Sequence, residues 1–184
     1  LEAAMATAFD STFAAPAMIS TPQRMAGVGD DYVRSCLATV SSSNKIHGMK
    51  VVLDCAHGAG FEVAPEALLH CGADLRVIGA GPDGVNINAG HGSTDTAALK
   101  AAVLDARADI GLALDGDADR IIVVDETGTE IDGDQVMALI VRELHASGRL
   151  KGGGMVSTVM SNMGLDQYMQ SLGLTLARTK VGDR

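Results

Sequence analysis

From residue 49 onward, short apolar segments alternate with segments whose apolar residues recur at helical spacing. Strands are expected at 50–55, 74–79, 109–114, 121–125, 154–160 and 174–180. Helices are expected from near Asp30 and at 61–72, 93–107, 134–148 and 161–173, the third of these capped by Ser93 or Thr94. This order predicts an α/β protein with mixed, mostly parallel sheets and helices on both faces.

The alternation is interrupted by the polar turn ETGTEIDG at residues 126–133 and then begins again. We therefore expect one complete unit over residues 21–129 and the N-terminal part of a second over residues 130–184. Residues 1–20 are Ala-rich with helical spacing and then contain Pro16, which predicts the closing helix and linker of a preceding domain. Because the chain begins without Met and ends in TKVGDR, we expect an interior fragment of a longer protein.

The charge and composition exclude several classes of partner. The formal net charge is -9, and the sequence contains no cluster of Lys and Arg residues, so we expect no nucleic-acid partner. No apolar stretch reaches the roughly 18 residues of a membrane span, so we expect no membrane partner. The three cysteines lack CxxC spacing, which favours reduced core residues in a cytoplasmic protein. These patterns leave the oligomeric state open.

Three aspartates follow the expected strand 109–114 at every second position, as Asp115, Asp117 and Asp119. In an extended loop such side chains point the same way, and open α/β sheets bind their ligands beyond the carboxyl ends of strands. Three carboxylates at one point repel each other and need a counter-charge, for which a hard cation such as Mg²⁺ is the usual choice. Arg120 follows directly, and its guanidinium group suits an anionic ligand such as a phosphate.

Two other interpretations of this loop are open. A solvated acidic turn, with Arg120 paired to a neighbour, would produce the same residues. A calcium loop of the EF-hand type would place Asp115 first and Glu126 twelfth. Against the calcium loop, the sixth position holds Arg120 where that motif needs Gly, and the flanking segments are strand-like.

The string LDGDADRIIVVDETGTEIDGDQ closely resembles the metal-binding loop of the α-D-phosphohexomutase superfamily, whose members carry DGDxDR between their second and third domains. The stretches GPDGVNINAGHGSTD, VSTVMSNMGL and TKVGDR resemble the phosphoglucosamine mutase branch of that superfamily. The resemblance covers essentially the whole chain. It implies the end of a first domain, one complete phosphohexomutase-type second domain and the first part of a third.

The resemblance also implies an activity. Members of this branch interconvert glucosamine 6-phosphate and glucosamine 1-phosphate through a phosphoserine and a bisphosphorylated sugar, on the route to UDP-N-acetylglucosamine and the cell wall. Asp115, Asp117 and Asp119 would hold Mg²⁺, while Arg120 and Lys180 would bind the phosphosugar. The phosphoserine would lie in the first domain, so this chain alone would be inactive and would depend on the missing domains of the same protein.

Two alternatives to this activity remain. A phosphomannomutase or phosphoglucomutase would carry the same DGDxDR loop, and a non-catalytic calcium-binding module would carry the acidic residues without a phosphate partner. Four further polar residues lie in loops, namely His57, Asn86, Asn88 and His91. For these we expect local turn chemistry.

Overall fold

The computed structural model describes residues 25–40 and 46–182. The expected helix and linker at residues 1–20 lie outside these ranges. Helix α2 (Val28–Ala38) begins where the sequence predicts a helix, with Asp30 and Asp31 in its first turn. Carboxylates at this position interact favourably with the positive end of the helix dipole.

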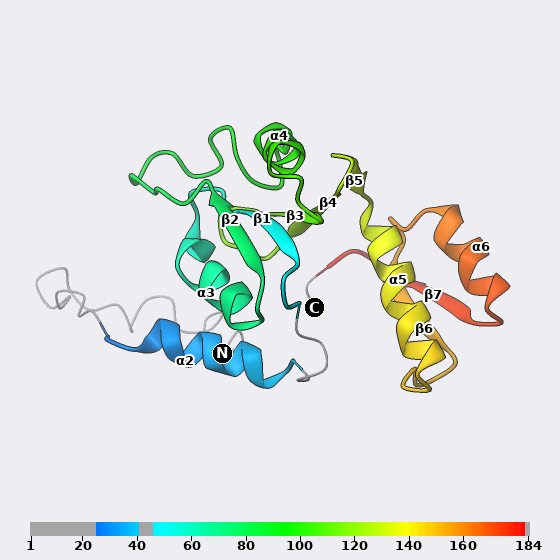
Figure 1. The fold of residues 1–184 in the computed structure, drawn as a ribbon. Coiled ribbons are helices and arrows are strands. Elements are labelled where there is room, and N and C mark those ends of the chain that lie inside the picture. The colour runs from blue at the N-terminus through cyan, green and yellow to red at the C-terminus, as the bar shows by residue number, and fades with distance from the viewer. Residues whose placement is uncertain (1–24, 41–45, 183–184) are drawn as a thin grey trace, which may run out of the picture.

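A five-stranded sheet forms the centre of the first unit, with the strand order β2-β1-β3-β4-β5 (Figure 1). The strands are β1 (Lys50–Asp54), β2 (Asp74–Ile78), β3 (Ile110–Leu114), β4 (Ile121–Asp125) and β5 (Glu130–Ile131). β1 pairs in parallel with both β2 and β3, while β3, β4 and β5 pair antiparallel in succession. The parallel pairs need helical crossovers, and the antiparallel pairs are joined by short turns. The sheet is therefore mixed, as predicted.

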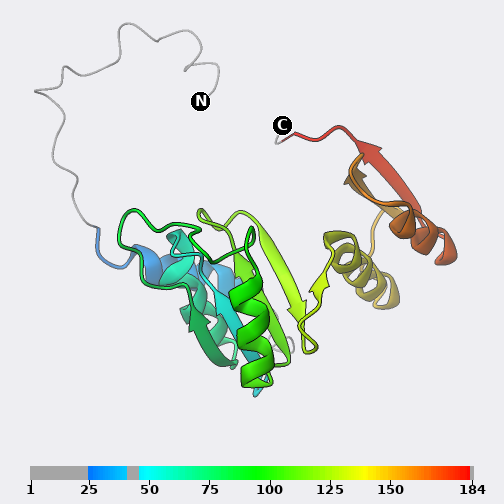
Figure 2. The ribbon, with the colours of Figure 1, turned by 90° about the horizontal axis from the view of Figure 1, so that it is seen from above.

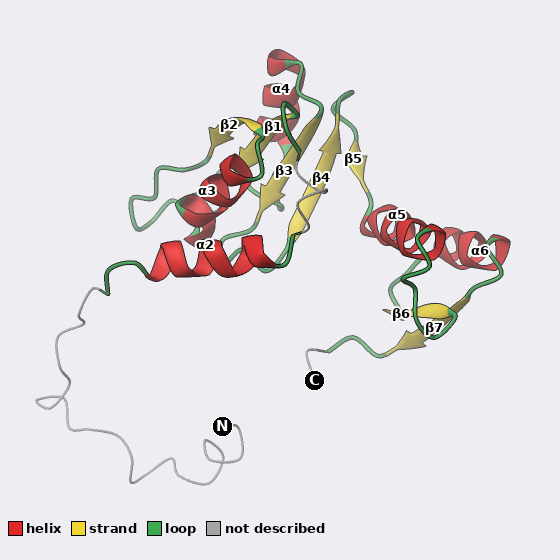
Figure 3. Cartoon of the chain, turned by 60° about the horizontal axis from the view of Figure 1, so that its bottom comes forward, coloured by secondary structure: helices red, strands yellow, loops and turns green. Residues whose placement is uncertain are grey.

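Helices cover both faces of this sheet (Figure 3). Helix α4 (Ala97–Ala106) lies on one face, and α3 (Val63–His70), preceded by the short 3-10 turn η3 (Ala59–Phe61), lies on the other with α2 against it. The core beneath α4 is a cluster of buried residues: Val52, Leu99, Ala102, Val103, Ala108, Ala113 and Val124. Gly111 allows α4 to approach closely, because a β-carbon there would lie 2.6 Å from Val103 Cγ2.

A second, two-stranded sheet follows along the chain (Figure 2). Helix α5 (Gly133–Ala146) leads to β6 (Gly154–Thr158), and α6 (Met163–Ser171) connects β6 to the parallel strand β7 (Thr175–Thr179). Asp132 caps α5 in a capping box with Gln135, and Asn162 caps α6. The two helices pack through Val141, Leu165 and Met169, which are buried.

Two features differ from the expectations. Helix α4 begins at Ala97 with Thr96 at the N-cap, so the predicted caps Ser93 and Thr94 are wrong. The Ser93 N–H instead donates to the Leu114 carbonyl at 2.9 Å, which keeps residue 93 in a loop tied to β3. The expected turn at 126–133 also contains the short strand β5.

Within the described residues, no helix combines the length and apolar character that a membrane span requires.

Candidate metal centre

The three predicted aspartates lie in a six-residue loop, Asp115–Arg120, that joins β3 to β4. Leu114 and Ile121 are paired residues of the two strands, so the loop closes a hairpin. The Ala118 N–H donates to the Asp115 carbonyl at 3.0 Å, and Ala118 has a left-handed φ of 62°. The loop is therefore a tight turn, and the expectation of an extended loop with alternating side chains is wrong.

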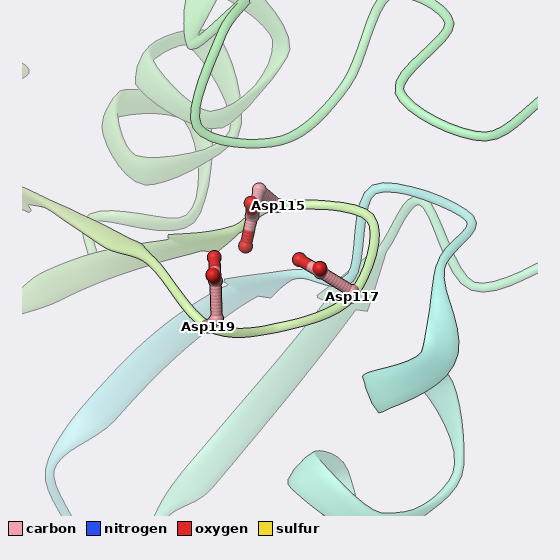
Figure 4. Close-up of side chains that lie close together, drawn as sticks. All are labelled: Asp115, Asp117 and Asp119. Carbon is pink, nitrogen blue, oxygen red and sulfur yellow. The ribbon is translucent and has the colours of Figure 1, made fainter. Parts of the chain in front are cut away.

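The turn nevertheless brings the three carboxylates together (Figure 4). One carboxylate oxygen from each of Asp115, Asp117 and Asp119 lies within 4.8 Å of the other two. Asp115 is buried and the other two aspartates are exposed. An all-oxygen donor set open on one side suits a hard divalent cation, which takes its remaining ligands from water or from a bound ligand.

Arg120 compensates part of the negative charge. Its backbone N–H donates to Asp115 Oδ1 at 3.0 Å, and its Nε donates to Asp115 Oδ2 at 2.9 Å. Burial raises the pKa of Asp115, but these hydrogen bonds outweigh burial and hold its pKa at about 2. The same bond to Asp115 raises the pKa of Arg120. Asp115 is therefore an anion throughout the physiological range.

Asp119 shows the cost of crowding three carboxylates. Its contact with Asp115 and the charge of Asp117 raise its pKa, although Arg120 Nε lies 3.6 Å from its Oδ1. One arginine therefore does not fully neutralise the cluster, because it bonds mainly to Asp115. A divalent cation among the three oxygens would supply the missing positive charge, so the residues present fit such an ion.

The strands that flank this loop bear on the calcium alternative. An EF-hand loop joins two helices, whereas Asp115–Arg120 joins the antiparallel strands β3 and β4. The sixth position holds Arg120, where an EF-hand loop has Gly. The Arg120 side chain donates a hydrogen bond to Asp115 and so closes the turn. The geometry therefore does not match an EF-hand loop.

Lys180 and the aspartate loop belong to different sheets. Lys180 follows β7 in the second sheet and is exposed. Within the described residues, no hydrogen bond or ion pair joins Lys180 to the aspartates. Its role with the phosphosugar stays a prediction.

One buried polar group near the loop is not predicted from the sequence. Asp54, the last residue of β1, is fully buried, and its Oδ2 lies 3.1 Å from His91 Nδ1. The signal was an aspartate that directly follows the apolar residues Val51, Val52 and Leu53 in one strand. The expected turn chemistry is present at Asn86, whose side chain accepts from the Asp83 N–H at 3.0 Å and donates to the Gly81 carbonyl at 2.9 Å. It is wrong for the two histidines, since His91 contacts Asp54 and His57 Nδ1 accepts from the Gly81 N–H at 3.1 Å, both far along the chain.

The fold and this site define a class of protein, namely α/β domains with a carboxylate loop that could hold a metal ion at the carboxyl end of a sheet strand. The family model for phosphoglucomutase/phosphomannomutase alpha/beta/alpha domain II matches residues 30–128, and the model for domain III matches residues 132–184. The chain belongs to the phosphoglucomutase/phosphomannomutase family. The predicted membership of the phosphohexomutase superfamily is thus confirmed.

Two relatives show the similarity at the level of sequence. A phosphoglucosamine mutase of Hyphomonas neptunium is 66% identical over all of this chain, which covers 41% of the relative. A phosphoglucosamine mutase of Methylocella silvestris is 49% identical, and 42% of it is covered. The chain therefore spans about two fifths of the length of these curated relatives.

Solved structures show the same fold. A phosphoglucomutase/phosphomannomutase family protein from Burkholderia thailandensis matches 84% of this chain over 33% of its own, with a TM-score of 0.71 at 24% identity. An N-acetylglucosamine-phosphate mutase in its apo-form also matches 84% of this chain, over 37% of its own, with a TM-score of 0.60 at 19% identity. At these identities the likeness supports the fold alone.

Proposed function

We propose that this chain is the metal-holding part of a phosphoglucosamine mutase, an isomerase that interconverts glucosamine 6-phosphate and glucosamine 1-phosphate. The observation that carries the proposal is the convergence of Asp115, Asp117 and Asp119 beside Arg120. The 66% identity to a phosphoglucosamine mutase supports this sugar over mannose or glucose. Since the chain spans about two fifths of that relative, the rest of the mutase would lie in a longer protein.

In this proposal Asp115, Asp117 and Asp119 hold Mg²⁺. When bound, the ion offsets negative charge on the phosphoryl group that is transferred. Asp115 is held ionised and in place by Arg120, while Asp117 and Asp119 are exposed toward the open side of the loop. These three oxygens leave room for ligands from a phosphoserine outside this chain.

Arg120 and Lys180 are proposed to bind the phosphosugar. Arg120 bonds to Asp115 through Nε, and its side chain is 67% exposed, so the rest of the guanidinium is accessible to a phosphate. Lys180 follows β7, and carboxyl ends of parallel strands are where α/β sheets bind ligands.

The proposal includes an arrangement for the whole protein. Residues 21–129 would be its second domain, residues 130–184 would begin its third, and the preceding domain would carry the reactive serine. The partners would be the phosphosugar and these other domains, with no nucleic acid and no membrane. A sugar-phosphate isomerase of this kind would act in the cytoplasm.

The test is an assay of the purified full-length protein on glucosamine 6-phosphate, mannose 6-phosphate and glucose 6-phosphate, each with Mg²⁺. The highest kcat/KM on glucosamine 6-phosphate would support the proposal, and preference for mannose or glucose phosphate would replace it with the alternative mutases. A second measurement, competition between Mg²⁺ and Ca²⁺ for binding to the protein with and without its phosphorylation, distinguishes the mutase from a calcium-binding module. Such a module would bind Ca²⁺ with no dependence on phosphorylation.

A further inference from the structure

A single buried carboxylate connects two loops at the carboxyl edge of the first sheet. Asp54 ends β1 and has no exposed surface. Its Oδ1 accepts a hydrogen bond from the Ala56 N–H at 2.9 Å, and its Oδ2 accepts one from the Gly92 N–H at 3.0 Å. Because a buried carboxylate is costly unless its oxygens are bonded, these contacts fix both loops relative to β1.

The first of these loops, residues 55–59, holds the metal loop by its backbone. Ala56 and His57 adopt left-handed φ values of 54° and 49°, conformations that need support from surrounding bonds. Ala59, the last residue of this loop, donates its N–H at 2.8 Å to the carbonyl of Gly116, the second residue of the metal loop. The approach is so close that a β-carbon at Gly58 would collide with that carbonyl oxygen.

The second loop, residues 86–92, contacts the same glycine. A β-carbon at Gly116 would lie 2.6 Å from Ile87 Cδ1 and 2.9 Å from Asn88 Nδ2, so both side chains pack against this residue. The Asn88 N–H also donates to the Ala56 carbonyl at 2.8 Å, which ties the two loops to each other. Gly116 is thus held by both loops, and it separates Asp115 from Asp117.

We propose that Asp54 is a positioning residue for the metal loop. Its two oxygens hold the two loops that contact Gly116, and this keeps the carboxylates of Asp115 and Asp117 in their convergent arrangement. The inference rests on the proposed function, since it assumes that the aspartates hold a cation. It adds a residue that touches neither the ion nor the sugar, and that acts through the shape of the loop.

The test compares two substitutions by titrating the chain with Mn²⁺, followed by the EPR signal of the free ion. Mn²⁺ favours the same carboxylate ligands as Mg²⁺. Asp54→Asn keeps the side-chain size but turns one acceptor into a donor that faces the Ala56 or Gly92 N–H. We expect about tenfold weaker Mn²⁺ binding, the range seen when partners of metal ligands are altered.

Asp109→Asn is the matched control. Asp109 Oδ2 accepts a hydrogen bond from the Lys50 N–H at 2.8 Å, so it also joins a carboxylate to β1, but at the opposite end of the strand. We expect unchanged Mn²⁺ affinity and an unchanged Gly116 amide resonance in this variant. In Asp54→Asn that resonance should shift, at a temperature where circular dichroism shows both variants folded.

The outcomes separate the inference from the function on which it rests. If the parent chain binds no Mn²⁺ at millimolar concentration, the metal role of the aspartates and the positioning role of Asp54 are both overturned. If the parent binds Mn²⁺ and Asp54→Asn binds it equally well, the positioning role is overturned and the metal site stands. If Asp54→Asn does not fold, the Mn²⁺ affinity of Ile87→Ala is measured in its place. Ile87 is 56% exposed, so its truncation leaves the core intact. Unchanged Mn²⁺ affinity in this variant would overturn the inference.

Discussion

Arg120 donates to both carboxylate oxygens of Asp115, once from its backbone N–H and once from its side chain. The last residue of the loop thus closes onto the first, and Asp115 serves the structure as well as the proposed ion. Asp117 differs, because it makes no hydrogen bond or ion pair with any described residue and is exposed. This difference separates the two roles and allows each to be tested.

We expect Asp117→Asn in the full-length protein to lose most mutase turnover while keeping its fold. Altering an outer partner of a metal ligand costs about 10- to 100-fold, so loss of a ligand should cost at least about a hundredfold. An exposed side chain without partners contributes within about 0.5 kcal/mol to stability. Steady-state assays and thermal unfolding measure the two effects. Undiminished Mg²⁺-dependent turnover would contradict the ligand assignment.

We expect Asp115→Asn, in contrast, to destabilise the chain itself. The amide would turn a donor toward the Arg120 N–H groups, and the buried Asp115 would lose charge-assisted hydrogen bonds, which contribute about 1.5 to 3 kcal/mol. Urea unfolding of the 184-residue chain without added metal measures this cost. Asp117→Asn in the same chain is the control, and equal stability of the two variants would refute the structural role of Asp115.

The 184-residue chain alone should show no mutase activity and should bind Mg²⁺ weakly. Its three carboxylates leave several positions of an octahedral ion to water, and Mg²⁺ gives up water reluctantly. Holding a sugar in two orientations also requires binding groups beyond these loops. An assay on glucosamine 6-phosphate and a calorimetric Mg²⁺ titration check both parts. Measurable interconversion by the isolated chain would show that the missing domains are dispensable.

Much of the fold was predictable from local patterns. The apolar runs placed β1 and β3 within a residue of their observed ends, because buried strands of parallel sheets are continuous in sequence. The sequence identified which aspartates converge, but it did not predict the shape of the loop that brings them together. That shape depends on a left-handed backbone at Ala118, and alanine is not a residue that favours this conformation. The bond between Asp54 and His91 joins positions 37 residues apart, and no local pattern contains such a contact.

Cys55 should be the slowest of the three cysteines to react. Burial, with a smaller contribution from the charge of Asp54, raises its pKa to about 11. At pH 8 only about one molecule in a thousand would carry the thiolate, which is the reactive form. Cys36 and Cys71 are partly exposed and free. Alkylation with iodoacetamide followed by peptide mass mapping should label Cys36 and Cys71 first, and Cys55 only as the chain unfolds.

Glu130 should contribute a pH-dependent part of the stability. Hydrogen bonds from Lys100 and Thr96 lower its pKa below the ordinary value of 4.5, with Lys100 Nζ 2.8 Å away. Because the folded pKa is the lower one, the contribution is present above pH 4.5 and is lost as the pH falls through the folded pKa. The side chain is 45% exposed, so the effect should be at most about 1 kcal/mol.

The measurement for Glu130 is the difference in unfolding free energy between the parent chain and Glu130→Gln, from pH 7 down to pH 3. That difference should shrink toward zero at the acidic end. Glu126→Gln is the matched control, since Glu126 makes no hydrogen bond to a described residue. A difference that stays constant with pH would show that Glu130 acts through packing alone.

The pairing of Leu114 with Ile121 restricts how a loop like this one can change in length. Inserting one residue between them would either open the turn or slide β4 along β3 by one position. Sliding would exchange the two faces of β4 and turn Val124 out of the core beneath α4. Insertions and deletions of one residue in the loop are therefore resisted by the core beneath α4, whether or not an ion is bound.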